Sequence, residues 1–227
     1  MNKSVVSVII PCLNEIRALP ETLASLRQQD GDFEIIVVDG FSDDGTWEYL
    51  QQQPAITCLQ ATRGRASQMN AGARQAHGEW LLFLHADTRL PRQAITTISQ
   101  LGASVQAGGF RQSFTPRDWR LRLISWIDNL RCRLTHIIYG DQALFVRRGL
   151  FEQLRGFPEI THIEDIRFGE TLLEHTRPLL LPMTAITDAR KFLKMGVWRS
   201  LGRIFVILVC VELKLPLFGK VFFQNIR

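Results

Sequence analysis

The sequence lacks most of the cysteine and charge patterns that define a protein class directly. Its four cysteines, Cys12, Cys58, Cys132 and Cys210, are widely separated and include no C-x-x-C pair, which argues against a structural zinc site or a disulfide framework. Only 22% of the 227 residues are charged and 46% are hydrophobic, a balance that excludes a disordered chain and favours a compact globular protein. Reduced cysteines are typical of a cytoplasmic protein.

Long apolar runs are also missing. The run that follows Lys3 ends at Pro11, too early for the hydrophobic region of a signal peptide, so we expect no secretion. A second run, at 204–213, extends further only by crossing a lysine and a proline. It is shorter than the roughly 20 apolar residues that a membrane-spanning helix requires. We therefore expect a cytoplasmic protein without a transmembrane helix.

The positive charge is unevenly distributed. The formal net charge is +5, yet the segment from Ala189 to Arg227 holds eight basic residues and one acidic residue, Glu212. A second basic stretch, RDWRLRLISWIDNLRCRL at 117–134, mixes arginines with tryptophans and leucines at helical spacing. Such helices suit an anionic membrane surface, which would place the protein peripherally on the inner face of the membrane. An ordinary solvated helix face is the alternative interpretation.

Several nucleotide-binding and nucleic-acid-binding motifs are absent. No helix-turn-helix, zinc finger or aromatic RNA-binding motif accompanies the basic charge, so nucleic acid is not an expected partner. The chain also has no Walker loop and no G-x-G-x-x-G, which removes the commonest motifs for ATP and dinucleotides.

Apolar runs and helical patterns alternate through the first half of the chain. Short apolar runs bounded by turn residues are typical of buried strands, and Gly78 suits the C-terminal cap of the helix before it. This alternation predicts βαβ units, and hence an α/β fold with a mostly parallel central sheet flanked by helices on both faces. The expected strands are 5–10, 33–40, 56–60 and 80–84, and the expected helices are 20–29, a short segment ending near 52, and 64–78.

The alternation becomes less regular after Pro91. Gly108 and Gly109 predict a bulge or a close backbone approach within a strand. No linker is visible, so we treat 1–190 as one domain with halves 1–102 and 103–190, and we assign 191–227 to a basic amphipathic helical tail. The expected elements here are a helix at 92–100, a strand at 105–114, the arginine-rich helix at 117–134 and a strand at 143–148.

Polar residues gather where the predicted strands end. Asn14 follows the first strand, Asp39 and Asp44 follow the second, and the apolar run WLLFL leads into His85 and Asp87. Each cluster alone also fits a turn or a helix cap. Because parallel strands end at one edge of a sheet, the carboxylates converge, and unpaired carboxylates repel unless a cation or a hydrogen-bonding ligand separates them. A divalent cation that carries phosphate groups would supply both.

Positive partners for phosphate follow the third strand. RGRASQMNAG at 63–72 places Arg63 and Arg65 at a helix start, where guanidinium and backbone N–H groups can approach a diphosphate. A solvated arginine is the alternative, and the position between two acidic strand ends favours the ligand.

Five segments, in this order, resemble the signatures of the family 2 glycosyltransferases, which have the glycosyltransferase-A fold. They are SVIIPCLNE, IIVVDGFSDDGT, RGRASQMNAG, WLLFLHADTRLP and THIEDIRFGE, and the resemblance runs from Ser7 to Arg190. It implies an inverting enzyme that moves a sugar from a nucleoside-diphosphate sugar, expected to be UDP-linked, to an acceptor hydroxyl. The compact chain and the form LHADTRLP also resemble a bacterial subgroup commonly labelled arsenosugar-biosynthesis glycosyltransferases.

The resemblance also implies a donor site in the first half of the chain. HAD stands in place of the D-x-D motif, so Asp87 is implied as the ligand of a divalent cation, Mg²⁺ or Mn²⁺, on the diphosphate. His85 departs from the pattern, because a neutral imidazole suits a ribose hydrogen bond or a softer cation. The residues implied around the nucleotide sugar are Pro11, Asn14, Glu15, Asp39, Ser42, Asp44, Arg63, Asn70, His85 and Ala86.

The second half of the chain is implied to bind the acceptor. THIEDIRF matches the late E-D motif, so Asp165 is implied as the general base and Glu164 as a residue that orients or gates the acceptor. Asp141 and Gln142 fit acceptor binding or support of the base, and His162 adds to this polar cluster; exposed helix acids are the alternative for E-D. A sugar-phosphate nucleotidyltransferase, which would need a glycine-rich loop where the chain has PCLNE, and a non-catalytic nucleotide-sugar-binding or membrane-scaffold protein remain open.

Overall fold

The structure is a computed structural model that describes residues 5–160, 163–196 and 202. Most of the tail predicted at 191–227 and the predicted site residue His162 lie outside the described residues. No helix in the described part of the chain is long and apolar enough to cross a membrane.

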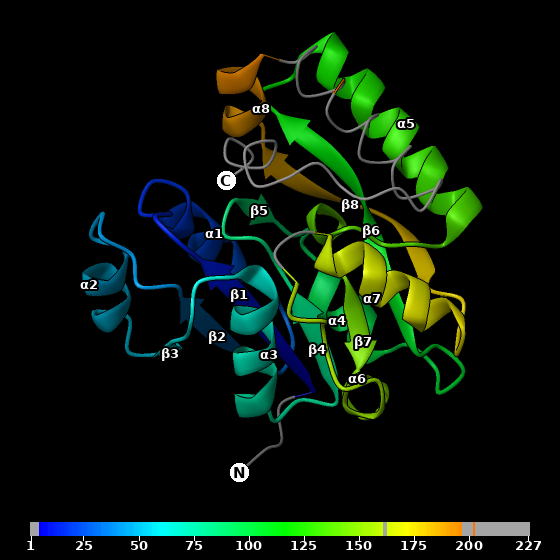
Figure 1. The fold of residues 1–227 in the computed structure, drawn as a ribbon, viewed down its shortest axis with the longest axis horizontal. Coiled ribbons are helices and arrows are strands. Elements are labelled where there is room, and N and C mark those ends of the chain that lie inside the picture. The colour runs from blue at the N-terminus through cyan, green and yellow to red at the C-terminus, as the bar shows by residue number, and fades with distance from the viewer. Residues whose placement is uncertain (1–4, 161–162, 197–201, 203–227) are drawn as a thin grey trace.

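The first half of the chain forms a parallel half-sheet (Figure 1). β1 (Val6–Cys12) pairs with β2 (Phe33–Asp39) on one side and β4 (Trp80–Phe83) on the other, and β3 (Thr57–Gln60) lies outside β2. Val8 is in register with Ile35 and Leu82, and β1 is buried along its whole length. Burial on both faces explains the continuous apolar runs, and all four predicted strands are confirmed.

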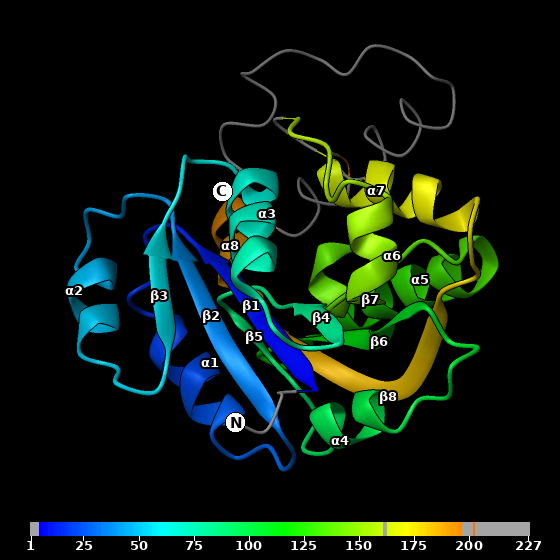
Figure 2. The same ribbon diagram turned by 90° about the horizontal axis from the view of Figure 1, so that it is seen from below.

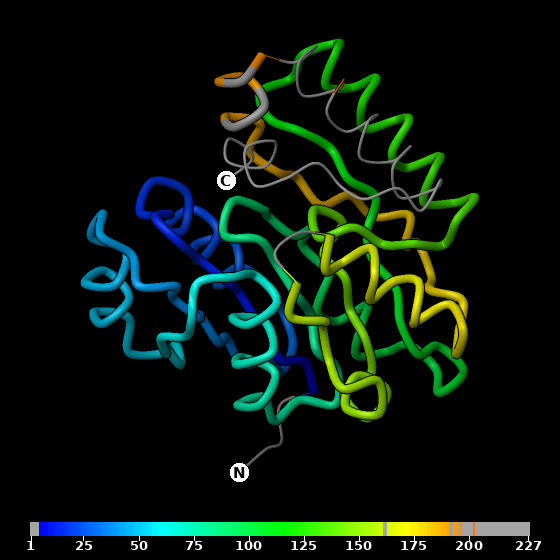
Figure 3. The backbone as a smooth tube through the Cα atoms, in the orientation of Figure 1, coloured from blue at the N-terminus to red at the C-terminus, as the bar shows by residue number. Residues whose placement is uncertain are grey.

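The second half extends the sheet with mixed pairing. β7 (Phe145–Arg147) runs antiparallel to β4, and β6 (Ala107–Thr115) runs antiparallel to β7. β8 (Leu179–Asp188) runs parallel to β6, and β5 (Thr88–Arg89) runs antiparallel to β8. Figure 3 shows β6 and β8 side by side despite their separation in the chain. The strand order is β3-β2-β1-β4-β7-β6-β8-β5, and the sequence predicted neither β5 nor β8.

Helices cover both faces of the sheet, as predicted (Figure 2). One face carries α1 (Leu19–Leu26) and α4 (Ala94–Ser99), and the opposite face carries α3 (Arg65–Gln75), α6 (Arg148–Gln153) and α7 (Glu164–Leu173). The other helices are α2 (Thr46–Gln51), α5 (Trp119–Thr135), the 3-10 turn η1 (Gly140–Gln142) and α8 (Arg190–Met195).

The alternation of side chains along β1 divides them between two hydrophobic cores. Val8 and Ile10 belong to the core that contains Leu23 of α1, whereas Ile9 belongs to the core that contains Met69 of α3. Apolar contacts therefore cover both faces of the sheet, which confirms the mixed α/β architecture. This packing holds the parallel strands in place, and their carboxyl ends lie at one edge.

The position of Gly108 confirms the close backbone approach predicted for it. A Cβ there would lie 2.4 Å from the carbonyl oxygen of Leu179 in β8 and 2.5 Å from the ring of Phe145. The pairing of β6 with β8 also shifts register shortly afterwards, between Phe110 and Arg111.

The prediction for Gly78 was wrong. The C-terminal cap of α3 is Ala76, and Gly78 instead lies against β1, where a Cβ would stand 2.7 Å from the backbone nitrogen of Ser7. Its role is a close approach between backbones and not the end of a helix.

Gly108→Ala is expected to lower the free energy of unfolding by about 1–3 kcal/mol, because its Cβ would overlap a backbone atom that cannot move aside cheaply. Gly149→Ala in α6 is the matched control, since no atom lies within 4 Å of a Cβ there and alanine favours a helix by up to about 1 kcal/mol. Guanidinium unfolding measures both effects, and equal midpoints for the two variants would contradict the close approach.

Candidate active site

The loops after β1 and β2 are hydrogen-bonded to each other at the carboxyl edge of the sheet. Asn14, in the left-handed region with φ 56°, donates its N–H to Ser42 Oγ at 2.8 Å, and its Oδ1 accepts the N–H of Asp43 at 3.0 Å. Asp44 accepts the N–H of Ile16 at 3.2 Å. Residues predicted from two separate motifs to hold the nucleoside thus form one connected structure.

The carboxylates at this edge already have donors within the protein. Asp39 is fully buried and accepts the N–H of Ser42 and the Nε2 of Gln60, each at 3.0 Å. Glu15 pairs with Arg190 at the start of α8. Asp39 and Glu15 are therefore not the unpaired carboxylates for which the sequence predicts a cation or a hydrogen-bonding ligand, because Gln60 and Arg190 come from distant parts of the chain to bind them.

Hydrogen bonds from the protein also stabilise the charged form of Asp44. Burial acts to raise the pKa of Asp44, but hydrogen bonds from Thr46 and from the Ile16 N–H outweigh burial and hold this pKa below its ordinary value. Asp44 is consequently a charged, internally bonded part of the loop.

The backbone of the HAD segment, which follows β4, is hydrogen-bonded to α1 and to β8. Ala86 is buried and its carbonyl accepts the Oγ1 of Thr22 in α1 at 2.8 Å. The carbonyl of Asp87 accepts the N–H of Asp188 in β8 at 3.0 Å. These bonds fix the strand exit that carries His85 and Asp87.

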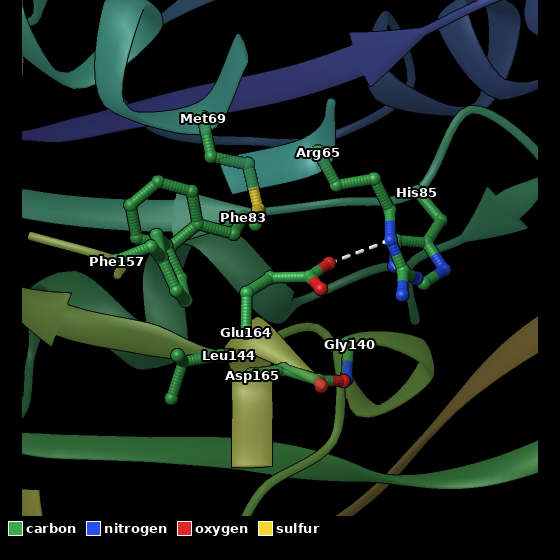
Figure 4. A pocket seen from close by; sticks show the side chains of 9 residues that line it. All are labelled: Arg65, Met69, Phe83, His85, Gly140, Leu144, Phe157, Glu164 and Asp165. Carbon is green, nitrogen blue, oxygen red and sulfur yellow. Dashed lines mark hydrogen bonds and ion pairs between the residues drawn. The ribbon is translucent and has the colours of Figure 1, made fainter. Parts of the chain in front are cut away.

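A small pocket lies beside His85, between the N-terminal ends of α3 and α7 (Figure 4). It brings together side chains from the donor motifs and from the E-D motif, with an apolar wall beside a polar one. The lining residues are Arg65, Met69, Phe83, His85, Gly140, Leu144, Phe157, Glu164 and Asp165.

An ion pair crosses this pocket. Arg65 Nε lies 2.7 Å from Oε1 of Glu164, whose side chain is only 3% exposed. Burial acts to lower the pKa of Arg65, but the carboxylates of Glu164, Asp165 and Asp141 outweigh it and raise this pKa. NH1 of Arg65 also lies 3.4 Å from Nε2 of His85.

Arg63 occupies a different position from Arg65. Its Nε and NH2 atoms donate to the carbonyl oxygens of Gly40 at 3.2 Å and Phe41 at 3.0 Å, so it shapes the loop after β2. Arg65, the first residue of α3, is the arginine that lines the pocket. The motif RGRAS contains both arginines, and only the helix start determines which one enters the pocket.

Gly140 joins the HAD segment to the E-D motif. Its N–H donates to Oδ2 of Asp165 at 2.9 Å, while Oδ1 of Asp165 accepts the N–H of Ile166 at 2.9 Å. A Cβ on Gly140 would lie 2.5 Å from Nε2 of His85 and 3.4 Å from Oδ2 of Asp165. His85 and Asp165 therefore approach the same glycine, and the carboxylate of Asp165 has a fixed orientation.

A second polar cluster, which includes residues of α5, supports the turn η1 that contains Gly140. Oε1 of the buried Gln142 accepts from NH2 of Arg131 at 3.2 Å, and Arg131 pairs with Asp128 at 2.9 Å. Burial and the carboxylates of Asp128 and Asp165 raise the pKa of Asp141 to about 8, although Arg131 opposes this. The sequence did not single out Arg131 and Asp128, because their stretch reads as a basic helix surface.

Asn70 shapes the pocket through another residue. Its Nδ2 donates to the carbonyl of Phe157 at 2.8 Å, and its Oδ1 accepts the N–H of Phe157 at 2.9 Å. The ring of Phe157 lies 4.8 Å from that of Phe83 in the apolar wall. A direct contact of Asn70 with a nucleotide remains a prediction.

The side chains that the structure describes could hold a divalent cation only together with a bound phosphate group. Among the described residues, no group of three or more His, Cys, Asp or Glu side chains could hold a metal ion by itself. Mg²⁺ and similar hard cations are usually held by one or two carboxylates together with substrate phosphates. Asp87 fits that mode, with a diphosphate completing the coordination, whereas His85 lies against Gly140 and Arg65.

The fold is the glycosyltransferase-A fold, as predicted. S. aureus TarS in complex with UDP superposes with a TM-score of 0.65 and 21% identity, over 81% of this chain and 60% of that one. The mannosyltransferase PcManGT from Pyrobaculum calidifontis, in complex with GDP-Man and Mn²⁺, superposes with a TM-score of 0.67 and 23% identity, over 100% of this chain and 68% of that one. At these identities the likeness establishes the fold alone.

The chain belongs to glycosyl transferase family 2, whose sequence profile matches residues 7–153. A PGL/p-HBAD biosynthesis glycosyltransferase of Mycobacterium bovis is 39% identical over 157 residues, 64% of this chain and 60% of the relative. An undecaprenyl-phosphate 4-deoxy-4-formamido-L-arabinose transferase of Pseudomonas fluorescens is 32% identical over 192 residues, 78% of this chain and 56% of the relative. The chain thus spans about three fifths of the length of the curated relatives that it matches.

Asp141→Asn tests the raised pKa of Asp141 through stability. A carboxyl whose pKa is raised by folding favours its protonated form in the folded protein, so stability present at low pH is lost as the pH rises from 3.8 to about 8. Urea unfolding near pH 5 and pH 8 should show a larger loss of unfolding free energy for the wild type than for Asp141→Asn. Asp30→Asn, at an exposed carboxylate, should behave like the wild type. Equal losses in all three proteins would contradict the assignment.

Proposed function

We propose that the chain transfers a sugar from a nucleoside-diphosphate sugar, UDP-linked, to an acceptor hydroxyl with inversion at the anomeric carbon. The observation that carries the proposal is the meeting of His85 and Asp165 at Gly140, which joins the donor edge to the E-D helix in one pocket. Group transfer requires the leaving and attacking groups to be held close together. Family membership and the complexes of TarS with UDP and PcManGT with GDP-Man support a nucleotide-sugar donor.

The donor would bind along the edge formed by the linked loops. Asn14, Ser42 and Asp44 would border the nucleoside. The carboxylate of Asp39, which accepts the N–H of Ser42, would keep Ser42 in position. Asp87 would hold a divalent cation together with the diphosphate, and the bound cation would offset the negative charge that develops on the leaving group. The guanidinium of Arg65, in the pocket beside His85, would add a positive charge.

Asp165 would act on the acceptor side. Its carboxylate would accept the proton of the acceptor hydroxyl while the oxygen bonds to the anomeric carbon and the bond to the diphosphate oxygen breaks. The N–H groups of Gly140 and Ile166 orient this carboxylate. Asp141 and Gln142 would support the same turn.

Glu164 would be coupled to donor binding through Arg65. A diphosphate would compete with the carboxylate of Glu164 for the guanidinium of Arg65, which now lies 2.7 Å from it. One relative is named an undecaprenyl-phosphate 4-deoxy-4-formamido-L-arabinose transferase, and this supports a membrane-associated acceptor and a peripheral location on the membrane.

Asp87→Ala is expected to abolish the part of UDP affinity that depends on Mn²⁺, because it removes the carboxylate that would hold the cation beside the diphosphate. Calorimetry with UDP, with and without Mn²⁺, measures this difference directly. Asp30→Ala is the control, since Asp30 is exposed and precedes β2 at the opposite edge of the parallel strands. Metal-dependent UDP affinity that persists in Asp87→Ala would exclude the metal role.

Asp165→Asn is expected to lower kcat roughly a hundredfold or more, the usual range for a general base, with an unchanged Kd for UDP. The amide cannot accept both N–H groups that the carboxylate now binds, so stability should also fall, by about 1.5–3 kcal/mol. Turnover must therefore be measured well below the Tm of the variant.

Glu170→Gln, at an exposed carboxylate of the same helix, is the control and should retain both activity and stability. A loss of UDP affinity as large as the loss of rate in Asp165→Asn would show that the E-D pair is structural.

A further inference from the structure

The helix α5 buries apolar side chains such as Leu121 and Ile124 against the protein, and it also exposes a second set of apolar side chains, which an ordinary surface helix does not. The exposed apolar residues recur every three or four positions and therefore form one stripe along the helix. They are Trp119 (66% exposed), Leu123 (42%), Trp126 (63%), Ile127 (48%), Leu130 (39%) and Leu134 (74%), here called the α5 outer face.

The inner side of α5 is held by the apolar packing of Leu121 and Ile124 against Phe114 and by polar contacts. Asn129 exchanges two hydrogen bonds of 2.9 Å with the backbone of Gln112 in β6. Arg131 pairs with Asp128 at 2.9 Å, and its guanidinium lies 3.4 Å from the centre of the Tyr139 ring. The helix cannot rotate to bury its apolar stripe without breaking these contacts, so the exposure is built into the fold.

The position and the charge of the α5 outer face indicate which kind of partner could bind it. Figure 1 shows α5 at the periphery of the molecule, beyond β6 and away from β1, β2 and β3. Arg122 and Arg133 are exposed among the apolar residues, and Arg117 is exposed just before the helix. The acidic residues of the segment, Asp118 and Asp128, are paired with neighbouring arginines. Among the described residues of this segment, the charge left unpaired is therefore positive.

We infer that the α5 outer face binds an anionic lipid surface. Trp119 and Trp126 suit the headgroup region, where amphipathic rings are favoured, and the exposed arginines match lipid phosphates. A second copy of the chain is a poorer match. A symmetric interface would bring the same arginines of two copies together, and the acids of this segment are already paired.

The inferred surface lies across α5 from the acceptor side of the pocket. Arg131 reaches from the inner side of α5 to Gln142, in the turn that carries Gly140. An α5 outer face on a membrane would therefore bring this side of the pocket close to the lipid. The inference about the surface itself does not depend on the proposed reaction.

Flotation of the full chain with vesicles tests the inference. Vesicles of equal parts phosphatidylglycerol and phosphatidylcholine should carry the wild type, and Leu130→Glu should lower the partition coefficient about tenfold or more. Leu179→Glu is the matched control, because Leu179 is 40% exposed on β8 and Leu130 is 39% exposed. Its binding should equal that of the wild type.

A second pair of variants tests the charge. Each cation near an anionic surface contributes about fivefold to binding, so the double variant Arg122→Gln/Arg133→Gln should bind roughly 25-fold more weakly. The double variant Arg74→Gln/Arg92→Gln, at exposed arginines elsewhere, removes the same charge and should lose much less.

Two results would overturn the inference. One is equal vesicle binding by wild type, Leu130→Glu and Leu179→Glu, or no binding by any of them. The other is a dimer of the wild type in sedimentation that Leu130→Glu dissociates, which would assign the α5 outer face to a second copy. Thermal unfolding of each variant confirms that it is folded, and no thermal penalty is expected at exposed positions.

Discussion

The pocket depends on the absence of a side chain at residue 140. A Cβ there would overlap the imidazole of His85 and would touch the carboxylate of Asp165, so the imidazole could not keep its position. The same residue uses its N–H to hold Asp165, which means that one glycine supplies both the space and the hydrogen bond. The two halves of the chain meet at this point, and the rest of the site is arranged around it.

Charge balance is the second requirement of the pocket. Arg65 lies among carboxylates, and its paired partner Glu164 is almost fully buried. A buried carboxylate without a partner strongly destabilises a protein. If an anion binds Arg65 in place of Glu164, Glu164 must therefore find another donor or become protonated. Asp141 already favours its protonated form at neutral pH, which limits the negative charge that the cluster carries.

The elements that could be predicted from the sequence are those whose burial leaves a simple pattern. β1 is buried on both faces and reads as an unbroken apolar run, whereas β8 mixes buried and exposed residues and contains Pro182. β5 has two residues, too few for any periodicity. The convergence of the strand ends follows from parallel topology, and so the gathering of polar residues at this edge was predictable.

Interactions between distant segments were not predictable. The burial of Asp39 was not visible in the sequence, nor was its donor Gln60, which lies 21 residues further along the chain. The choice of Arg65 over Arg63 depends on where α3 begins, and the contribution of Arg131 depends on which side of α5 faces the sheet. In each case a tertiary contact decides the role of a residue whose local sequence allows several.

The hydrogen bonds between the loops after β1 and β2 have a consequence for the energetics of recognition. Asn14 and Ser42 hold these loops together without any ligand, so their conformational entropy is already lost when the chain folds. A ligand that binds at this edge meets a preorganised surface, and little of its binding free energy is consumed in ordering the backbone. Loss of the link between the loops should therefore slow the formation of complexes and weaken them by more than the loss of any contact that Asn14 or Ser42 makes itself.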